Sequence, residues 1–309
     1  MRLGLCCKFF EEPIKFRTTT AKYTERFGRS EQLMRLSLLC LENARSLLKS
    51  IEYCGSNNIG CFRVNSRILP LKTHPDIGYA LSDLPDSEEI RAVFSQCRKK
   101  AIKLDIRLSF HPDQFVLLSS HKTDVVQKSI EELDYQAEIS ELIGADVINI
   151  HGGGAYGDKE SALKRLCGTL SKLKKSVRKR LTLENDDRVY TPADLLPFCK
   201  EHDVPLVYDV HHHRCLPDKL SIKEATKLAL KTWKREPLFH LSSPKYGWSH
   251  NHSGWHSDYI DAKDFPGEWK NLNITVEVEA KAKELAVKRL YNDLRLNLDR
   301  KKKINRSYS

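Results

Sequence analysis

The stretch Leu206-Val-Tyr-Asp-Val-His-His-His213 joins a short apolar run to an acid and three histidines. The run before Asp209 has the length and composition of a buried strand, and we expect the chain to pass into a loop after it. Asp209 and His212 lie three positions apart, and carboxylate oxygens and imidazole nitrogens are common ligands of divalent metals. A surface loop that happens to contain histidines is the alternative, and this stretch alone does not decide between the two.

The same order of residues, an apolar run followed by His, Asp or Glu, recurs along the chain. Eight short apolar runs alternate with segments of helical spacing, which is the pattern of a single (β/α)8 barrel. The predicted strands are 2–6, 61–64, 106–110, 146–150, 181–183, 205–208, 237–241 and 272–278. The predicted helices are 30–51, a helix starting at Ser87, 124–143, 159–179, 195–202, 221–234 and 281–299.

Six predicted strands end at or just before a side chain that can bind a metal. These side chains are His111, His151, Glu184, Asp209, His240 and Glu279. Because the chemistry of such barrels lies at the carboxyl ends of the strands, closing the barrel would bring all six to one mouth. A single histidine after a strand is more often structural, but six at equivalent positions are hard to obtain by accident. Histidine and carboxylate ligands without cysteine suit manganese, zinc, iron or magnesium better than a structural zinc.

Composition and charge narrow the class of protein. The chain has 309 residues, 40% of them hydrophobic, and no linker or repeat. We therefore expect one barrel domain over 1–299 and a basic tail over 300–309. The formal net charge of +11 favours a polyanionic partner such as nucleic acid or an anionic membrane face, and charge alone does not exclude a basic soluble protein without such a partner. Nine cysteines without a CxxC pair do not suggest a disulfide framework or a zinc knuckle. With no signal peptide or apolar span evident, we expect a cytoplasmic monomer that does not enter a membrane.

More than one metal ion at the mouth would suit phosphodiester hydrolysis. Two or three close ions can activate a water, hold a phosphate and stabilise a leaving oxygen. The basic residues of the mouth loops, Arg67, Lys72 and Lys245, are expected to contact phosphates. Glu277 and Glu279 lie two positions apart, so a strand would point both the same way, and the spacing does not choose between them.

Seven motifs taken together resemble the UV damage endonucleases, a family similar in fold to endonuclease IV. The motifs are His111-Pro-x-Gln-Phe115, His151-Gly-Gly-Gly154, Leu183-Glu-Asn-Asp-Asp187, Asp209-x-x-His212, His240-Leu-Ser-Ser243, His256-Ser-Asp-Tyr-Ile260 and Glu279-Ala-Lys281. They run in family order and cover nearly the whole chain. The resemblance implies an enzyme that nicks double-stranded DNA immediately 5′ of ultraviolet photoproducts and leaves a 3′-hydroxyl. It also implies a cluster of two or three divalent ions, manganese being typical and magnesium or zinc the alternatives.

Motif position in this family implies a set of site residues. The implied metal ligands are His74, His111, His151, Glu184, Asp209, His212, His240, His256 and Glu279. The Glu-Ala-Lys match favours Glu279 over Glu277. We assign the catalysis to His111, Glu184, Asp209 and Glu279, through metal activation of a water. Gln114 and Phe115 match the pair that pushes into the duplex opposite the lesion, where a flat ring offsets part of the unstacking cost. A core aromatic is the alternative for Phe115.

The chain departs from the family pattern at three positions. Family members have a tyrosine where this chain has Phe115, and they often have a tyrosine where this chain has Leu5. Some carry a modified, metal-bridging lysine at Leu238, so this difference bears on the number of ions. Two rival classes are a metal-dependent sugar isomerase or epimerase on the same barrel and a DNA-binding protein that has lost catalysis. An abasic-site endonuclease differs from the first interpretation only in its substrate.

Overall fold

The eight predicted strands form one parallel sheet in the computed structural model, which describes residues 1–294. The strands are β1 (Arg2–Cys6), β2 (Cys61–Val64), β3 (Arg107–Phe110), β4 (Val147–His151), β5 (Leu181–Glu184), β6 (Leu206–Val207), β7 (Leu238–Leu241) and β8 (Thr275–Val278). They are ordered β6-β5-β4-β3-β2-β1-β8-β7. A single parallel bridge, Asp209 to His240, joins β6 to β7 and nearly closes the barrel. The predicted (β/α)8 barrel is therefore confirmed.

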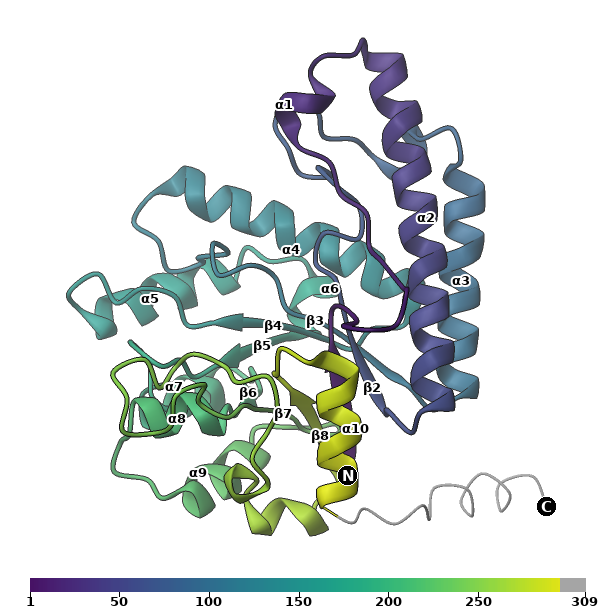
Figure 1. Ribbon diagram of the computed structural model, residues 1–309. Helices are drawn as coiled ribbons and strands as arrows, with labels where there is room; N and C mark the ends of the chain where they lie inside the picture. The colour runs from purple at the N-terminus through teal and green to yellow at the C-terminus, as the bar shows by residue number, and fades with distance from the viewer. Residues whose placement is uncertain (295–309) are drawn as a thin grey trace.

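Helices cover the outside of this sheet (Figure 1). The α-helices are α1 (Ala21–Thr24), α2 (Arg29–Ser56), α3 (Ser87–Lys103), α4 (Thr123–Ile143), α5 (Lys159–Leu170), α6 (Lys175–Arg178), α7 (Pro192–Glu201), α8 (Val210–Cys215), α9 (Ile222–Leu230) and α10 (Lys283–Asp293). Short 3₁₀ turns are η1 (Leu81–Asp83), η2 (Ala262–Asp264) and η3 (Gly267–Asn271). The long helices α2 and α3 lie side by side along one flank of the barrel. Among the helices of residues 1–294, none is long and apolar enough to cross a membrane.

Alternation along the strands separates an apolar outer face from a largely polar interior. Phe62, Phe110 and Phe239 are fully buried in the main hydrophobic core of the protein. Sequence-coded caps position the helices that cover this layer. Thr191 and Ser221, for example, each form a capping box at the start of α7 and α9.

The structure corrects two predicted elements. The loop expected after Asp209 is a short helix, α8, because the Asp209 carboxylate accepts a hydrogen bond from His212 N (2.8 Å) and caps it. The helix predicted over 159–179 is two helices, α5 and α6. Between them Leu173 is buried, and its N–H donates to Leu170 O in a tight turn that ends the first helix. The predicted final helix is present as α10, while its last residues and the basic tail lie outside the described residues.

The amino end of the barrel interior is closed by apolar packing and arginine–carboxylate pairs. Val147, Val207, Leu238 and Trp233 form a separate small cluster there. Arg107 donates to both oxygens of Asp146 (3.0 and 2.9 Å), and Arg2 donates to both oxygens of Glu236 (2.7 and 2.8 Å). The charges of these two pairs are therefore already satisfied by protein groups.

Candidate metal centre

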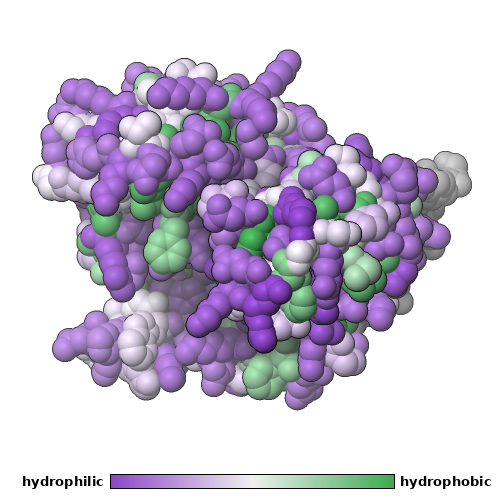
Figure 2. All heavy atoms as spheres, turned by 90° about the horizontal axis from the view of Figure 1, so that it is seen from above, coloured by the Kyte–Doolittle hydropathy of each residue, from purple (hydrophilic) through white to green (hydrophobic). Residues whose placement is uncertain are grey.

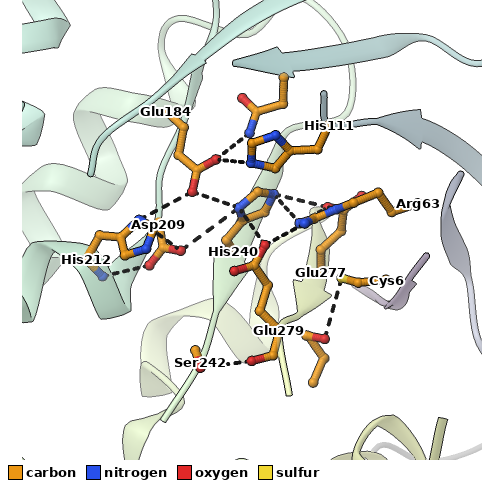
Figure 3. Close-up of polar contacts among 12 residues, drawn as sticks. Cys6, Arg63, His111, Glu184, Asp209, His212, His240, Ser242, Glu277 and Glu279 are labelled. Carbon is orange, nitrogen blue, oxygen red and sulfur yellow. Dashed lines mark hydrogen bonds and ion pairs between the residues drawn. The ribbon is translucent and has the colours of Figure 1, made fainter. Parts of the chain in front are cut away.

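The carboxyl ends of the strands bring seven of the predicted ligands into one cluster. Three overlapping groups have all their ligand atoms within 4.8 Å of one another. The groups are His111, His240 and Glu279; His111, His151 and Glu184; and Glu184, Asp209 and His212. Because His111 and Glu184 each belong to two groups, the three sets are contiguous. Figure 3 shows His240 at the centre of this region, with Glu184 on one side and Glu279 on another.

Glu184 links the histidines of the cluster. Its Oε2 lies 3.0 Å from His111 Nε2, and its Oε1 lies 3.0 Å from His240 Nδ1 and 3.4 Å from His212 Nδ1. Asn149 Nδ2 donates to the same Oε2 at 2.5 Å, and Thr182 Oγ1 donates to Asn149 Oδ1 at 2.9 Å. A side chain held from so many directions has one orientation, which a binding site requires.

The cluster keeps the Glu184 and Glu279 carboxylates ionised although burial opposes it. Burial opposes ionisation of Glu184, but the imidazoles of His240 and His151 outweigh it and hold the pKa well below its usual value. Burial also opposes ionisation of Glu279, but Arg63 and His240 keep the pKa of that carboxyl low. Conversely, burial would lower the pKa of His240, but the Glu184 and Glu279 carboxylates raise it to about 10. Without a cation, protonated imidazoles therefore balance much of the negative charge.

The turn from β6 into α8 sets Asp209 and His212 side by side. Asn185 exchanges two hydrogen bonds with the backbone of Asp209, one from Asp209 N (3.0 Å) and one to Asp209 O (2.8 Å). His212 Nδ1 lies 3.0 Å from Asn185 O and 3.4 Å from Asp209 Oδ2. The side chain and the backbone carbonyl of Asn185, together with the cap of α8, thus place a carboxylate and an imidazole beside Glu184.

Two buried atoms of the cluster are without hydrogen-bond partners. Within residues 1–294, Asp209 Oδ2 and His151 Nδ1 have no hydrogen-bond partner, although Asp209 is fully buried. Leaving such atoms unpaired is costly, so they favour a group that is itself an acceptor of lone pairs. The surrounding donors are carboxylate oxygens and imidazole nitrogens without cysteine, which suits manganese, magnesium or zinc. The residues present therefore fit a cluster of divalent cations.

Two predicted ligands lie outside the three groups. His256 is next to the cluster, with Nδ1 3.7 Å from Glu279 Oε2. His74 is farther along the mouth, where its Nδ1 accepts from the backbone N–H groups of Asp76 and Ile77 at 3.3 Å each. It lines a pocket of about 450 Å³ that Phe115 also lines. His74 therefore lies beside the Phe115 loop and outside the three ligand groups.

The loop after β3 presents Gln114 and Phe115 to solvent. Phe115 is 72% exposed, so the alternative of a core aromatic is wrong. Asp113 Oδ1 accepts from Phe115 N (3.3 Å), and Arg67 forms an ion pair with the same aspartate (3.5 Å). Figure 2 shows a face of the molecule that is hollowed and surrounded mainly by hydrophilic residues. Lys72, by contrast, is only 13% exposed and pairs with Glu138 (3.6 Å), so it is poorly placed to meet a phosphate.

Three interior residues of the site were not singled out in the sequence as functional: Arg63, Asn149 and, in its actual role, Glu277. Asn149 lies two positions before His151, and Glu277 lies two positions before Glu279, so each faces the interior with that ligand. Arg63 lies on β2, where alternate positions also face inward. The alternation of side chains along the strands is therefore the sequence signal that indicates these interior residues. Arg63 and Glu277 stand in short, otherwise largely apolar strands, where a charged residue must find a partner.

Comparisons of sequence place this chain among known proteins. A family model described as UV-endonuclease UvdE matches residues 1–308. A UV DNA damage endonuclease of Bacillus velezensis is 36% identical over 289 residues, which is 89% of this chain and 87% of the relative. A UV DNA damage endonuclease of Bacillus cereus is 30% identical over 293 residues, covering 90% of this chain and 89% of the relative.

Comparisons of structure agree with those of sequence. The crystal structure of SacUVDE superposes with a TM-score of 0.85 at 26% identity, covering 96% of this chain and 98% of that one. Endonuclease IV from Thermus thermophilus gives a TM-score of 0.61 at 12% identity, with 96% and 99% coverage. A 3-keto-D-glucoside 4-epimerase from E. coli gives 0.58 at 11% identity, with 96% and 100% coverage. The last two likenesses concern the fold alone.

Proposed function

Because the chain belongs to the UV-endonuclease UvdE family and is thus a DNA-repair endonuclease, we propose that it nicks duplex DNA immediately 5′ of ultraviolet photoproducts. The nick would leave a 3′-hydroxyl from which repair synthesis can proceed. The observation that carries this proposal is the contiguous cluster of ligand atoms at the barrel mouth, within 4.8 Å in each group. Exposed Phe115 on a neighbouring mouth loop supports a duplex as the substrate.

The proposed cofactor is a cluster of divalent cations, manganese first, with magnesium or zinc as alternatives. The clustered residues His111, His151, Glu184, Asp209, His212, His240 and Glu279 would hold it, and His256 and His74 are proposed as outlying members. When bound, such ions lower the pKa of a water molecule and stabilise the negative charge on a departing 3′ oxygen. That chemistry requires no nucleophilic side chain.

The protein groups have separate tasks in this proposal. Glu184 and Asp209 supply buried negative charge, and Asn149 and Asn185 hold these two acids in place through the hydrogen bonds described above. The proposed catalytic set also includes His111 and Glu279. His111 belongs to two ligand groups, and Glu279 belongs to one of these two. The proposed set is thus fixed before the substrate arrives, which is how an enzyme avoids reorganisation during the reaction.

Lesion recognition is assigned to Gln114 and Phe115. Photoproducts weaken pairing and stacking, so separating the damaged bases costs less than separating normal ones. A ring that is 72% exposed can stack in the gap that the displaced bases leave. Phe115 retains the stacking face of the family's tyrosine without its hydroxyl. The phosphates would meet mouth residues such as Arg67, whose side chain is 71% exposed, and binding should weaken as salt rises.

The experiment that tests this function compares three labelled duplexes, one with a single defined photoproduct, one undamaged and one with an abasic site. Each is incubated with manganese and again after chelation. Metal-dependent cutting directly 5′ of the photoproduct is the expected result. Cutting of the abasic duplex alone would overturn the lesion assignment and retain the nuclease. No cutting of any duplex by protein that holds metal would favour the epimerase class or a binding protein.

A further inference from the structure

An arginine lies inside the barrel against two of the clustered ligands. Arg63 projects from β2 and is 7% exposed. Its Nη1 lies 2.6 Å from Glu279 Oε1, and its Nη2 lies 2.9 Å from His240 Nε2. Figure 3 shows its guanidinium pointing at His240, on the side opposite Glu184. A permanent positive charge therefore already occupies one side of the cluster.

Glu277 fixes this guanidinium in place. Arg63 Nε donates to Glu277 Oε2 at 2.5 Å, and Nη2 pairs with the same carboxylate. Ser109 Oγ donates to the other oxygen, and the carboxylate lies 3.1 Å from His240 Nε2. Burial opposes ionisation of Glu277, but Arg63 outweighs it and lowers the pKa to about 2. A buried pair with so many hydrogen bonds does not separate readily, since either charge alone would be uncompensated.

Arg63 contacts only one of the three ligand groups. Glu279 and His240 both belong to the group that includes His111. The groups containing Glu184 have no member that contacts Arg63 among the residues described. A dication in the first group would meet a guanidinium at hydrogen-bond distance from two of its ligands, and like charges repel strongly where water is excluded.

Strand β7 offers no second ligand that would offset this repulsion. The residue two positions before His240 faces the interior on the same side of β7. It is Leu238, which is fully buried with Val147, Val207 and Trp233. The first group therefore has one carboxylate, Glu279, and that carboxylate is shared with Arg63.

We propose that Arg63, held by Glu277, takes the place of a third cation, so that the chain binds two ions, one in each group that contains Glu184. This inference rests on the proposed function, because it presumes that the cluster holds metal. It assigns Arg63 a positioning role: the residue orients Glu279 and His240 and supplies positive charge at the end of the cluster near β2. Arg63 thus limits the number of ions that this chain binds, and it does so without contacting the substrate.

The test is a count of bound ions and requires no DNA. The full chain is stripped of metal, titrated with Mn²⁺, desalted and assayed for manganese by mass spectrometry, with free Mn²⁺ followed by electron paramagnetic resonance. Two ions per chain are expected. Three ions would overturn the inference and leave the proposed function intact. A chain that holds none would remove the metal site itself, and both proposals with it.

Paired substitutions assign the limit to Arg63. The double variant Arg63→Met/Glu277→Met removes the pair without leaving a lone charge, and it should hold a third Mn²⁺ that the wild type binds at least about 10-fold more weakly. The matched control, Arg107→Met/Asp146→Met, removes a pair at the other end and should leave the count at two. Arg63→Gln serves if the double variant does not fold. A folded Arg63 variant that still binds two ions would contradict the proposal.

Discussion

The two ends of the barrel interior both bury charged side chains but balance them differently. At the amino end, Arg107 and Asp146 are joined by two hydrogen bonds, and so are Arg2 and Glu236. At the carboxyl end, carboxylates face mainly imidazoles. A guanidinium does not release its proton, whereas an imidazole can release its proton to water and then bind a cation through the freed nitrogen. The same kind of burial therefore stabilises the fold at one end and forms a binding site at the other.

The largest contrast should come from one isosteric change made at each end. Glu184→Gln removes the charge shared by two ligand groups, and we expect strand cutting to fall about 10³-fold, which is about 4 kcal/mol. Single-turnover nicking of a photoproduct duplex at saturating Mn²⁺ measures it. Glu236→Gln is the control at the amino end and should cut at the wild-type rate. Equal losses in the two variants would show that the two ends are not functionally distinct.

Substitutions at the amino end of the barrel interior should change the stability of the fold rather than the rate of strand cutting. Asp146→Asn deprives the buried Arg107 guanidinium of its carboxylate, and we expect the free energy of unfolding to fall by about 2 kcal/mol, because Asp146 is partly exposed and the full cost of a buried pair does not apply. Urea denaturation measures the change. Asp105→Asn, at the exposed partner of Arg2, should shift it by less than about 0.5 kcal/mol. A folded Asp146→Asn protein with impaired cutting would contradict the division of roles.

The aromatic residues of the two ends should differ in the same way. Trp233 is buried at the amino end, whereas Phe115 is exposed at the mouth. We expect Phe115→Ala to weaken binding of a photoproduct duplex by about 10-fold, through the lost stacking, and to leave the melting temperature unchanged. Fluorescence anisotropy with metal-free protein measures it without cutting. Phe115→Tyr should bind normally, and Ile102→Ala, an exposed apolar residue on α3, is the control for nonspecific loss.

The smallest effect is a pH dependence at the amino end. Burial would raise the pKa of Glu236, but the hydrogen bond from Arg2 outweighs it and lowers the pKa below 4.5. A depressed pKa means that this stabilisation is present above about pH 4.5 and is lost as pH falls through the lower, folded-state pKa. Melting temperatures at about pH 7 and about pH 4 measure it. Glu236→Gln should lose less stability over that interval than the wild type does.

The sequence predicted the strand ends better than the interior contacts. Apolar runs ending in His, Asp or Glu placed His151, Glu184 and Asp209 correctly because a barrel gathers its strand ends at one mouth. Alternation indicated that Glu277 and Glu279 point the same way, but not that Arg63 lies between them and His240. Partners of that kind come from strands distant in sequence. The sequence does not predict α8 because its six residues, Val210–Cys215, are too few to show helical periodicity.

The line where β6 meets β7 gives the site a mechanical property. There one bridge joins the described strands, with a hydrogen bond from His240 N to Tyr208 O (3.1 Å), whereas β4 and β5 pair over four residues. Local opening is easiest where few backbone bonds must break. One residue of that bridge, Asp209, belongs to the ligand group of Glu184 and His212, so an ion bound in that group would hold the β6 side of this line in place. Amide hydrogen exchange at His240 should therefore slow when metal binds, while that of Ile150 in β4 should change little.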